Sequence, residues 1–271
     1  MAPIQQPPTF EVLALCDHCD ILITAYLDAL GILKKRPKSL GRYESEVEFY
    51  TLLKLMLRHL ESITVLARSD LVLAPSAHII ARTIFETSVR ARWMFIPIDP
   101  YEREVRWILF LHNGMIHTKK LAEIKDAPDT LKRIYEEKRS HYDHYYVGIS
   151  KLLTEKGYMI PKQIPNMWEM LKELAEPDLY RFYVQLSAFS HSNLEAASLY
   201  KRGLGDGKSI GEFISGYDWI LPFNVAWKSF YLAAREFLEL IEAKVNVFEK
   251  IADAKEYDVK IQALIKTAIG N

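Results

Sequence analysis

The fold is decided by the stretch PFNVAWKSFYLAAREFLELIEAKVNVFEKIAD, residues 222–253, near the C-terminal end of the chain. Its apolar side chains recur every three or four residues, at Phe223, Trp227, Phe230, Ala234, Phe237, Ile241, Val245, Phe248 and Ala252. That spacing places them on one face of an α-helix, because a helix completes a turn in about 3.6 residues. Such a face packs along a neighbouring helix or along a partner subunit. The stretch therefore predicts a long C-terminal helix.

Apolar residues recur at helical spacing through almost all of the chain, and strict apolar–polar alternation is hard to find. Helices are expected over residues 10–35, 44–69, 75–95, 99–124, 128–157, 166–175 and 178–189, with loops at 157–165 and 203–216. The connections are short, and short connections join antiparallel neighbours. The fold class is therefore all-α: residues 1–271 are expected to form one domain, a single multi-helix bundle with long antiparallel helices.

The composition of the 271-residue chain is that of a globular protein able to bury a core, with 49% hydrophobic and 26% charged residues. Lysine plus arginine and aspartate plus glutamate each number 35, so no overall basic field favours nucleic acid or an acidic membrane. No apolar run approaches the roughly 20 residues of a membrane span, and the opening MAPIQQPP lacks the features of a secretory signal. A cytoplasmic protein with no membrane partner is expected.

Short motifs that suggest cofactor or metal chemistry each have a simpler interpretation. Cys16 and Cys19 form a CxxC pair without a second ligand pair for zinc or the strand context of a redox site, so both are expected to be core side chains. The sequence GKS at 207–209 ends like a phosphate-binding loop, but Arg202 stands where that motif needs its first glycine. The Glu-x-x-His pattern of metal-binding helical bundles does not occur. No metal or cofactor is expected.

A different pattern points to nucleic-acid chemistry. Arg139 with His144, and Arg106 with His112, match the Arg-x4–6-His spacing of HEPN ribonucleases, which are all-α domains that cleave RNA without a metal. Two matches stand against about one expected by chance in a chain of this composition. HEPN sites usually carry a polar residue directly after the arginine, and Ser140 meets that condition. Arg139 and His144 are therefore the better candidate pair for binding RNA.

A second resemblance is carried by IARTIFET at 80–87, Trp93, Asp99-Pro100, NMW at 166–168 and LYRFYVQLSAFSHS at 179–192. These segments are similar to the core of a family of bacterial helical proteins of unknown function. Its recurring polar signatures are an Arg-x-x-x-Glu helix, here Arg82 and Glu86, and a Tyr-x-x-x-Ser-x-x-x-His helix, here Tyr183, Ser187 and His191. The similarity covers about residues 55–200. It implies an all-helical architecture like that of HEPN bundles, and it implies no activity.

The two signatures also make physical sense without the resemblance. Residues four apart share a helix face, so Arg82 and Glu86 form one polar ridge, and Tyr183, Ser187 and His191 form another. If the ridges face one another, the carboxylate fixes the tautomer of the imidazole, and the guanidinium is ready for a phosphate or carboxylate. The alternative is a buried polar network that only locks the helices in register.

Two functions follow from these observations. The first is a helical binding or regulatory module, homo-oligomeric through an apolar helix face, with a pocket around the two ridges for RNA or a small anionic ligand. The second is a metal-independent HEPN-like ribonuclease of toxin or phage-defence type. In that case His191 or His144 would act as general acid or base, and Arg82 or Arg139 would stabilise the charge of the phosphorane. Glu86 is the third catalytic candidate, as the carboxylate that fixes the tautomer of the imidazole.

Overall fold

The computed structural model describes residues 5–31, 41–126, 128–191, 193–203, 207–243, 248–249, 259, 261–262 and 266, and it confirms the all-α fold. The long helices are α1 (Phe10–Ala29), α3 (Glu44–Ser69), α4 (Ala74–Phe95), α5 (Pro100–Ala122), α6 (Asp129–Glu155) and α10 (Ile220–Leu240). The short helices are α7 (Met167–Glu173), α8 (Tyr180–Ser190) and α9 (Leu194–Ala197), with 3-10 turns at Leu71–Leu73, Pro177–Leu179 and Gly216–Trp219. A two-residue strand, β1 (Lys201–Arg202), pairs antiparallel with β2 (Ser209–Ile210).

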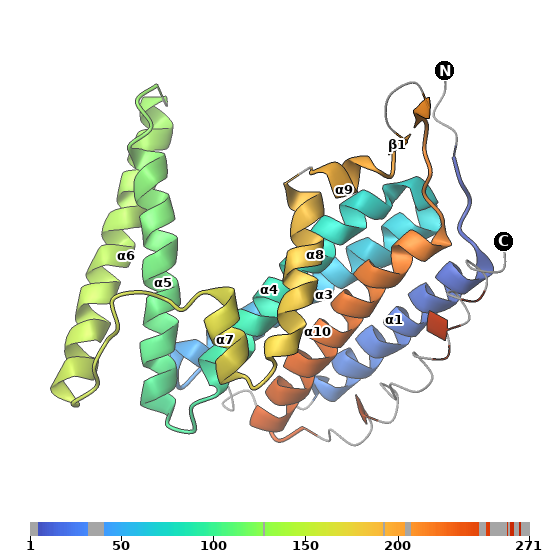
Figure 1. Cartoon of the computed structure of the whole chain (residues 1–271). Coiled ribbons are helices and arrows are strands. Elements are labelled where there is room, and N and C mark those ends of the chain that lie inside the picture. The colour runs from blue at the N-terminus through green and yellow to red at the C-terminus, as the bar shows by residue number, and fades with distance from the viewer. Residues whose placement is uncertain are drawn as a thin grey trace.

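Helices α3, α4 and α10 form the centre of the bundle and pack on one another along their lengths (Figure 1). Helix α1 lies against α3 and α10, and α8 crosses the outer side of α4. Two buried side chains hydrogen-bond across this packing: the hydroxyl of Ser88 donates to the carbonyl of Ser229 at 2.7 Å, and the indole of Trp219 donates to the carbonyl of Leu71 at 2.9 Å. Every buried donor that finds such a partner avoids a desolvation cost of about 1–3 kcal/mol.

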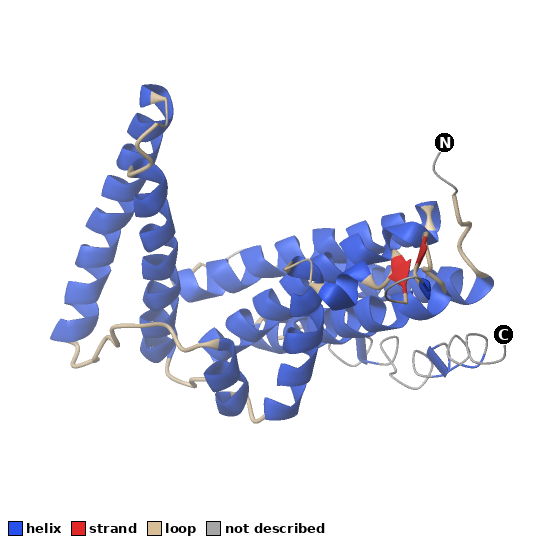
Figure 2. Cartoon of the chain, turned by 45° about the horizontal axis from the view of Figure 1, so that its top comes forward, coloured by secondary structure: helices blue, strands red, loops and turns tan. Residues whose placement is uncertain are grey.

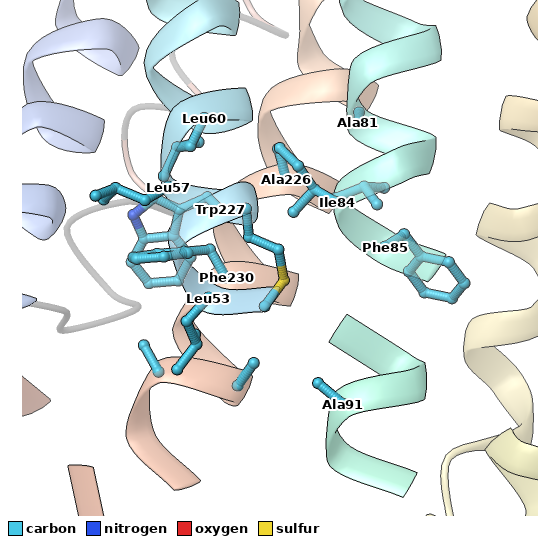
Figure 3. Close-up of a cluster of buried hydrophobic side chains, with 14 of the residues drawn as sticks. Leu53, Leu57, Leu60, Ala81, Ile84, Phe85, Ala91, Ala226, Trp227 and Phe230 are labelled. Atoms are coloured by element: carbon cyan, nitrogen blue, oxygen red, sulfur yellow. The ribbon is translucent and has the colours of Figure 1, made fainter. Parts of the chain in front are cut away.

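The periodic face of α10 supplies the middle of the core. Phe223, Trp227, Phe230 and Phe237 are each at most 1% exposed, and α10 packs on α3 and α4. Figure 3 shows Trp227 and Phe230 beside Leu53 and Leu57 of α3. Burying a large apolar side chain stabilises the fold by about 1.5–3 kcal/mol, so this one face makes a large contribution to the stability of the fold. The sequence left open whether this face packs on a neighbouring helix or on a partner subunit. In the structure it packs on helices of the same chain.

Helix α10 ends earlier than the apolar pattern suggests. The pattern continues to Ala252, whereas α10 stops at Leu240, and Glu242 adopts a left-handed conformation with φ 54°. The amide of Ala243 donates to the carbonyl of Leu238, and the amide of Glu242 donates to that of Glu239. These are the two hydrogen bonds of a Schellman motif, which closes a helix by satisfying its last carbonyls. Positions 245 and 252 of the predicted face lie outside the described residues.

Helices α5 and α6 form a hairpin that extends away from the bundle (Figures 1 and 2). Among the α6 side chains, all of which are described, only Leu153 is buried. The connection at 157–165 returns from the hairpin to α7, which lies beside the bundle. In the part of the chain that the structure describes, no helix combines the length and the apolar character that a membrane span needs.

Candidate functional site

Helices α4 and α8 run antiparallel, and this direction decides which of their side chains meet. Near the start of α4, His78 stacks on Phe189 with ring centres 3.8 Å apart. One turn further along α4, the Arg82 guanidinium lies 5.0 Å from the centre of the Tyr183 ring, and its Nη2 is 3.4 Å from the Tyr183 hydroxyl. The arginine of the first signature and the tyrosine of the second therefore do come together.

Glu86 holds two arginines on the outer face of α4. Arg82 Nε donates to Glu86 Oε1 at 2.7 Å, and Arg90 Nη2 donates to Glu86 Oε2 at 3.0 Å. The side chains of Arg82 and Glu86 are 15% and 18% exposed, and that of Arg90 is 39% exposed. Two guanidinium groups and one carboxylate leave a net charge of +1. The trio is fixed by short hydrogen bonds and remains open to solvent at its edge.

An aromatic hollow lies next to this trio. We call this cavity of about 490 Å³ the aromatic hollow, and it is lined by Asn166, Met167, Trp168, Tyr180 and Tyr183. Tyr180 stacks on Tyr183 with ring centres 5.5 Å apart, and Trp168 meets Tyr180 edge-on at 5.3 Å. A row of rings therefore leads from the hollow to Arg82, which lies over the last of them.

A local capping motif positions the indole side of the hollow. The side chain of Asn166 accepts from the amide of Glu169, and the Glu169 side chain accepts from the amide of Asn166, which makes a capping box at the start of α7. On α7, the Lys172 ammonium lies 5.0 Å from the centre of the Trp168 ring. The hollow thus has a cation at each end of its row of rings.

The remaining members of the second signature do not join Arg82 and Glu86. The Ser187 hydroxyl donates to the carbonyl of Tyr183 one turn back in α8, at 2.6 Å. His191 caps the C-terminal end of α8 and is exposed. It lies eight residues, or roughly 12 Å, from Tyr183 along the helix, on the side away from Glu86 because the helices are antiparallel. The expected enclosure of guanidinium, carboxylate and imidazole does not form.

The two Arg-x4–6-His pairs are also separated. His144 is exposed on α6, whereas Arg139, one turn away, forms an ion pair with Asp143 at 3.9 Å. Arg139 lines a cavity of about 290 Å³ together with His112 of α5. Arg106 lies instead over the Trp93 ring, 4.6 Å from its centre. The hairpin therefore pairs the arginine of one motif with the histidine of the other.

The sequence did not predict a buried ion network that is centred on Arg92 of α4. Arg92 donates to Glu236 of α10 at 2.7 Å and to both carboxylate oxygens of Glu176, at 2.7 and 2.9 Å. Burial alone would lower the pKa of Arg92, but its bonds to the two carboxylates outweigh burial and raise it. Burial raises the pKa of Glu236, and Arg92 partly offsets that rise.

No local pattern could have identified this network, because 84 and 144 residues separate Arg92 from its two partners. A backbone feature positions Glu176. Ala175 has a left-handed φ of 58°, and the amide of Glu176 donates to the carbonyl of Leu171, so α7 ends in a Schellman motif.

The CxxC pair is part of the core. Cys16 and Cys19 form no disulfide and are fully buried, and desolvation raises the pKa of the Cys16 thiol to about 12. A thiol of that pKa is a poor nucleophile at neutral pH. In the described residues, no group of three or more His, Cys, Asp and Glu side chains is arranged to hold a metal ion.

Comparison with known proteins adds one finding. No curated protein and no solved structure matches the chain significantly. The model of a family of unknown function, DUF5677, matches residues 49–208, which include α4, α8 and the aromatic hollow. Because this match spans more than half of the 271 residues, the chain belongs to that family of unknown function.

Proposed function

We propose that this protein is a binding module for a small anionic ligand with a flat ring, of which a nucleotide is the simplest example. The observation that carries the proposal is the contact between Arg82 and Tyr183 beside the aromatic hollow. It places a guanidinium at the end of a row of aromatic rings. A nucleotide has the matching order of groups, with a phosphate at one end and a planar base at the other.

The charge of the trio suits a phosphate. Glu86 pairs with one N–H group of Arg82 and one of Arg90, which leaves their other donors available and a net charge of +1 on the outer face of α4. Arginine binds phosphate well because its fork of N–H donors matches the phosphate oxygens. Since the Arg82 side chain is already fixed by Glu86 and Tyr183, little rotamer entropy is lost when a ligand binds.

The hollow suits a base. Stacking on aromatic side chains is worth about 1–3 kcal/mol per base and tolerates any base, because each has a π-face. Trp168 and Tyr180 meet edge-on, so a flat ring can lie against one while the other contacts its rim. A volume of about 490 Å³ falls within the range of small-molecule sites.

Titration calorimetry with three related compounds tests this assignment. AMP, adenosine and ribose 5-phosphate share parts, so the base and phosphate contributions separate. Arg82→Gln is expected to weaken AMP binding by about tenfold or more and to leave adenosine unchanged, because it removes a charged donor to phosphate. Trp168→Leu is expected to weaken AMP and adenosine alike, by about tenfold.

The control is Arg58→Gln, which removes an exposed arginine that pairs with Glu61 on α3. It should leave all three affinities unchanged. If AMP does not bind, or binds Arg82→Gln as tightly as the wild type, the proposed function is wrong.

One observation favours a second candidate function, a metal-independent ribonuclease. His112 and Arg139 line one cavity on the α5–α6 hairpin together with Lys119 and Asp143. An imidazole can act as general acid or base, and the two cations can stabilise a phosphorane that forms beside it. The RNA would then bind along the hairpin.

RNA incubated in EDTA with wild-type protein and single histidine variants tests the ribonuclease. Cleavage that is lost in His112→Ala and kept in His144→Ala supports the site on the hairpin. Cleavage that is lost in His191→Ala instead assigns the chemistry to the end of α8. No cleavage by the wild type contradicts the ribonuclease and leaves the binding module.

We also propose that the protein acts in the cytoplasm as a homo-oligomer. Two buried cysteines three residues apart that form no disulfide suit a reducing compartment. The apolar face of α10 is already used within the chain, so self-association needs another surface. Exposed apolar side chains on one side of α6 provide one, namely Leu131, Ile134 and Leu152. Sedimentation of the wild type and of an Ile134→Lys variant measures whether this face joins two copies.

A further inference from the structure

A second cavity, of about 610 Å³, lies between the end of α4, α5, α7 and the connection at 157–165. It shares no lining residue with the aromatic hollow. Its size falls within the range of small-molecule sites, about 300–1,000 Å³. Much of its wall is apolar, contributed by Trp93, Val105, Leu109, Met159, Pro161 and Pro165.

Two tethers hold the walls in place. Asp99 caps the start of α5, where its side chain accepts from the amide of Tyr101 at 2.9 Å. The same carboxylate accepts from the Tyr158 hydroxyl at 2.5 Å, which fastens the connection at 157–165 to α5. Gly157, at φ 88°, allows the sharp turn with which the chain leaves α6. Hydrogen bonds of Asp99 therefore hold both the start of α5 and the connection at 157–165 in place around the cavity.

Several hydrogen-bond donors on this wall are already used within the protein. The Trp93 indole donates to Glu173 Oε2 at 3.0 Å, and Arg106 Nη2 pairs with the same oxygen at 2.9 Å. Arg106 Nη1 donates to the carbonyl of Trp93 at 2.5 Å, and the guanidinium lies over the indole. The Tyr158 hydroxyl is taken by Asp99. The side-chain donors still available are Nε of Arg106, the second N–H on each of its Nη atoms and the amide of Gln163.

Three carboxylate oxygens on this wall are also available as acceptors. Oε1 of Glu173 and both carboxylate oxygens of Glu102 accept no hydrogen bond from any residue that the structure describes. Glu102 and Glu173 carry two negative charges, and Arg106 carries one positive charge, so the wall has a net charge of −1. A ligand that carries a positive charge and donates hydrogen bonds offsets this charge and fills the free carboxylate oxygens.

We propose that this cavity binds a small organic amine in its protonated form, with an apolar body against Val105, Leu109 and the proline-containing connection. Its ammonium group is held by Glu102 and by Oε1 of Glu173. The site differs from the aromatic hollow in its lining and in the sign of its charge, so its test does not depend on nucleotide binding.

Ligand-observed NMR titration of the full chain with two probes of matched shape tests the site. Phenethylammonium and 3-phenylpropionate have the same phenyl-ethyl body and opposite charges. Phenethylammonium is expected to bind at least about tenfold more tightly than 3-phenylpropionate. Glu102→Gln, at an exposed position on α5, should weaken phenethylammonium by about threefold or more, as expected for a partly screened charge pair.

Two further variants separate the site from general charge effects. Glu123→Gln removes an exposed carboxylate just beyond the other end of α5 and should leave the affinity unchanged. Met159→Lys, at a side chain that is 87% exposed, brings a competing ammonium to the cavity and should abolish binding. The proposal is overturned if 3-phenylpropionate binds as tightly as phenethylammonium, if Glu102→Gln binds like the wild type, or if neither probe binds.

Discussion

The guanidinium of Arg82 lies 5.0 Å from the centre of the Tyr183 ring, although 101 residues separate the two in the chain. This contact joins the outer face of α4 to α8. It also links the ion pair of Arg82 and Glu86 to the row of rings in the aromatic hollow. A cation–π contact at a partly exposed site is worth about 0.5–1 kcal/mol, which is modest for stability. The arrangement therefore suits a binding surface better than a structural lock.

The stability cost of losing Arg82 distinguishes these two roles. Arg82→Ala is expected to lower the free energy of unfolding by about 1–2 kcal/mol, because Glu86 keeps Arg90 as a partner and both groups reach solvent. Urea denaturation at neutral pH measures the change. A loss of about 3 kcal/mol or more would mean that the cluster primarily holds the helices in register.

Arg92 is expected to matter more to stability than any surface arginine. Arg92→Met leaves Glu176 and Glu236 without their shared partner, and breaking a buried ion pair costs about 3–5 kcal/mol. Arg68→Met is a matched control, since Arg68 also pairs with two carboxylates, those of Asp17 and Asp20, but at the surface.

The control should cost less than about 1 kcal/mol, because exposed ion pairs are screened by water and salt. Both variants can be compared by urea denaturation in the same buffer. Equal losses for Arg92→Met and Arg68→Met would show that burial adds nothing to the network.

Ala175→Gly is expected to stabilise the protein. Ala175 adopts φ 58°, a conformation that glycine reaches at no steric cost, so the change should add about 0.5–1 kcal/mol. The matched control is Ala14→Gly within α1, which should cost about 1 kcal/mol because glycine weakens a helix interior. Thermal melts measure both shifts. A lower Tm for Ala175→Gly would contradict the Schellman motif at the end of α7.

Acid is expected to destabilise the fold through His78. Burial lowers the pKa of His78, and this effect outweighs the opposite effects of the Ala74 carbonyl and of Asp218. The unfolded chain then binds more protons than the folded protein at and below the ordinary histidine pKa of about 6.5. Stability should therefore fall as the pH drops through that value, by at most about 1.4 kcal/mol per pH unit for this group.

Urea midpoints at a series of pH values from neutral to mildly acidic test this dependence. Half-buried His59, whose pKa burial also lowers, contributes in the same direction. His78→Gln should flatten the curve, because it removes the buried imidazole. If His78→Gln follows the wild-type curve, His78 is not a source of the acid sensitivity.

The sequence predicted the local part of the candidate site. Residues four apart on a helix share a face in any helical fold, so the pairing of Arg82 with Glu86 followed from spacing alone. The same rule placed Tyr183 and Ser187 together. It did not show how far along α8 the contact with α4 would lie, and the antiparallel packing leaves His191 beyond it.

The amino-acid sequence by itself determined that the chain is helical and which face of each helix is apolar, because both follow from the periodicity of about 3.6 residues. Only the tertiary structure decided which faces meet. It assigned Glu176 and Glu236 to Arg92, and it set His112 rather than His144 beside Arg139. Such contacts depend on the direction and depth at which distant helices pack, and these are set by the fit of the whole core, which no short stretch of sequence contains.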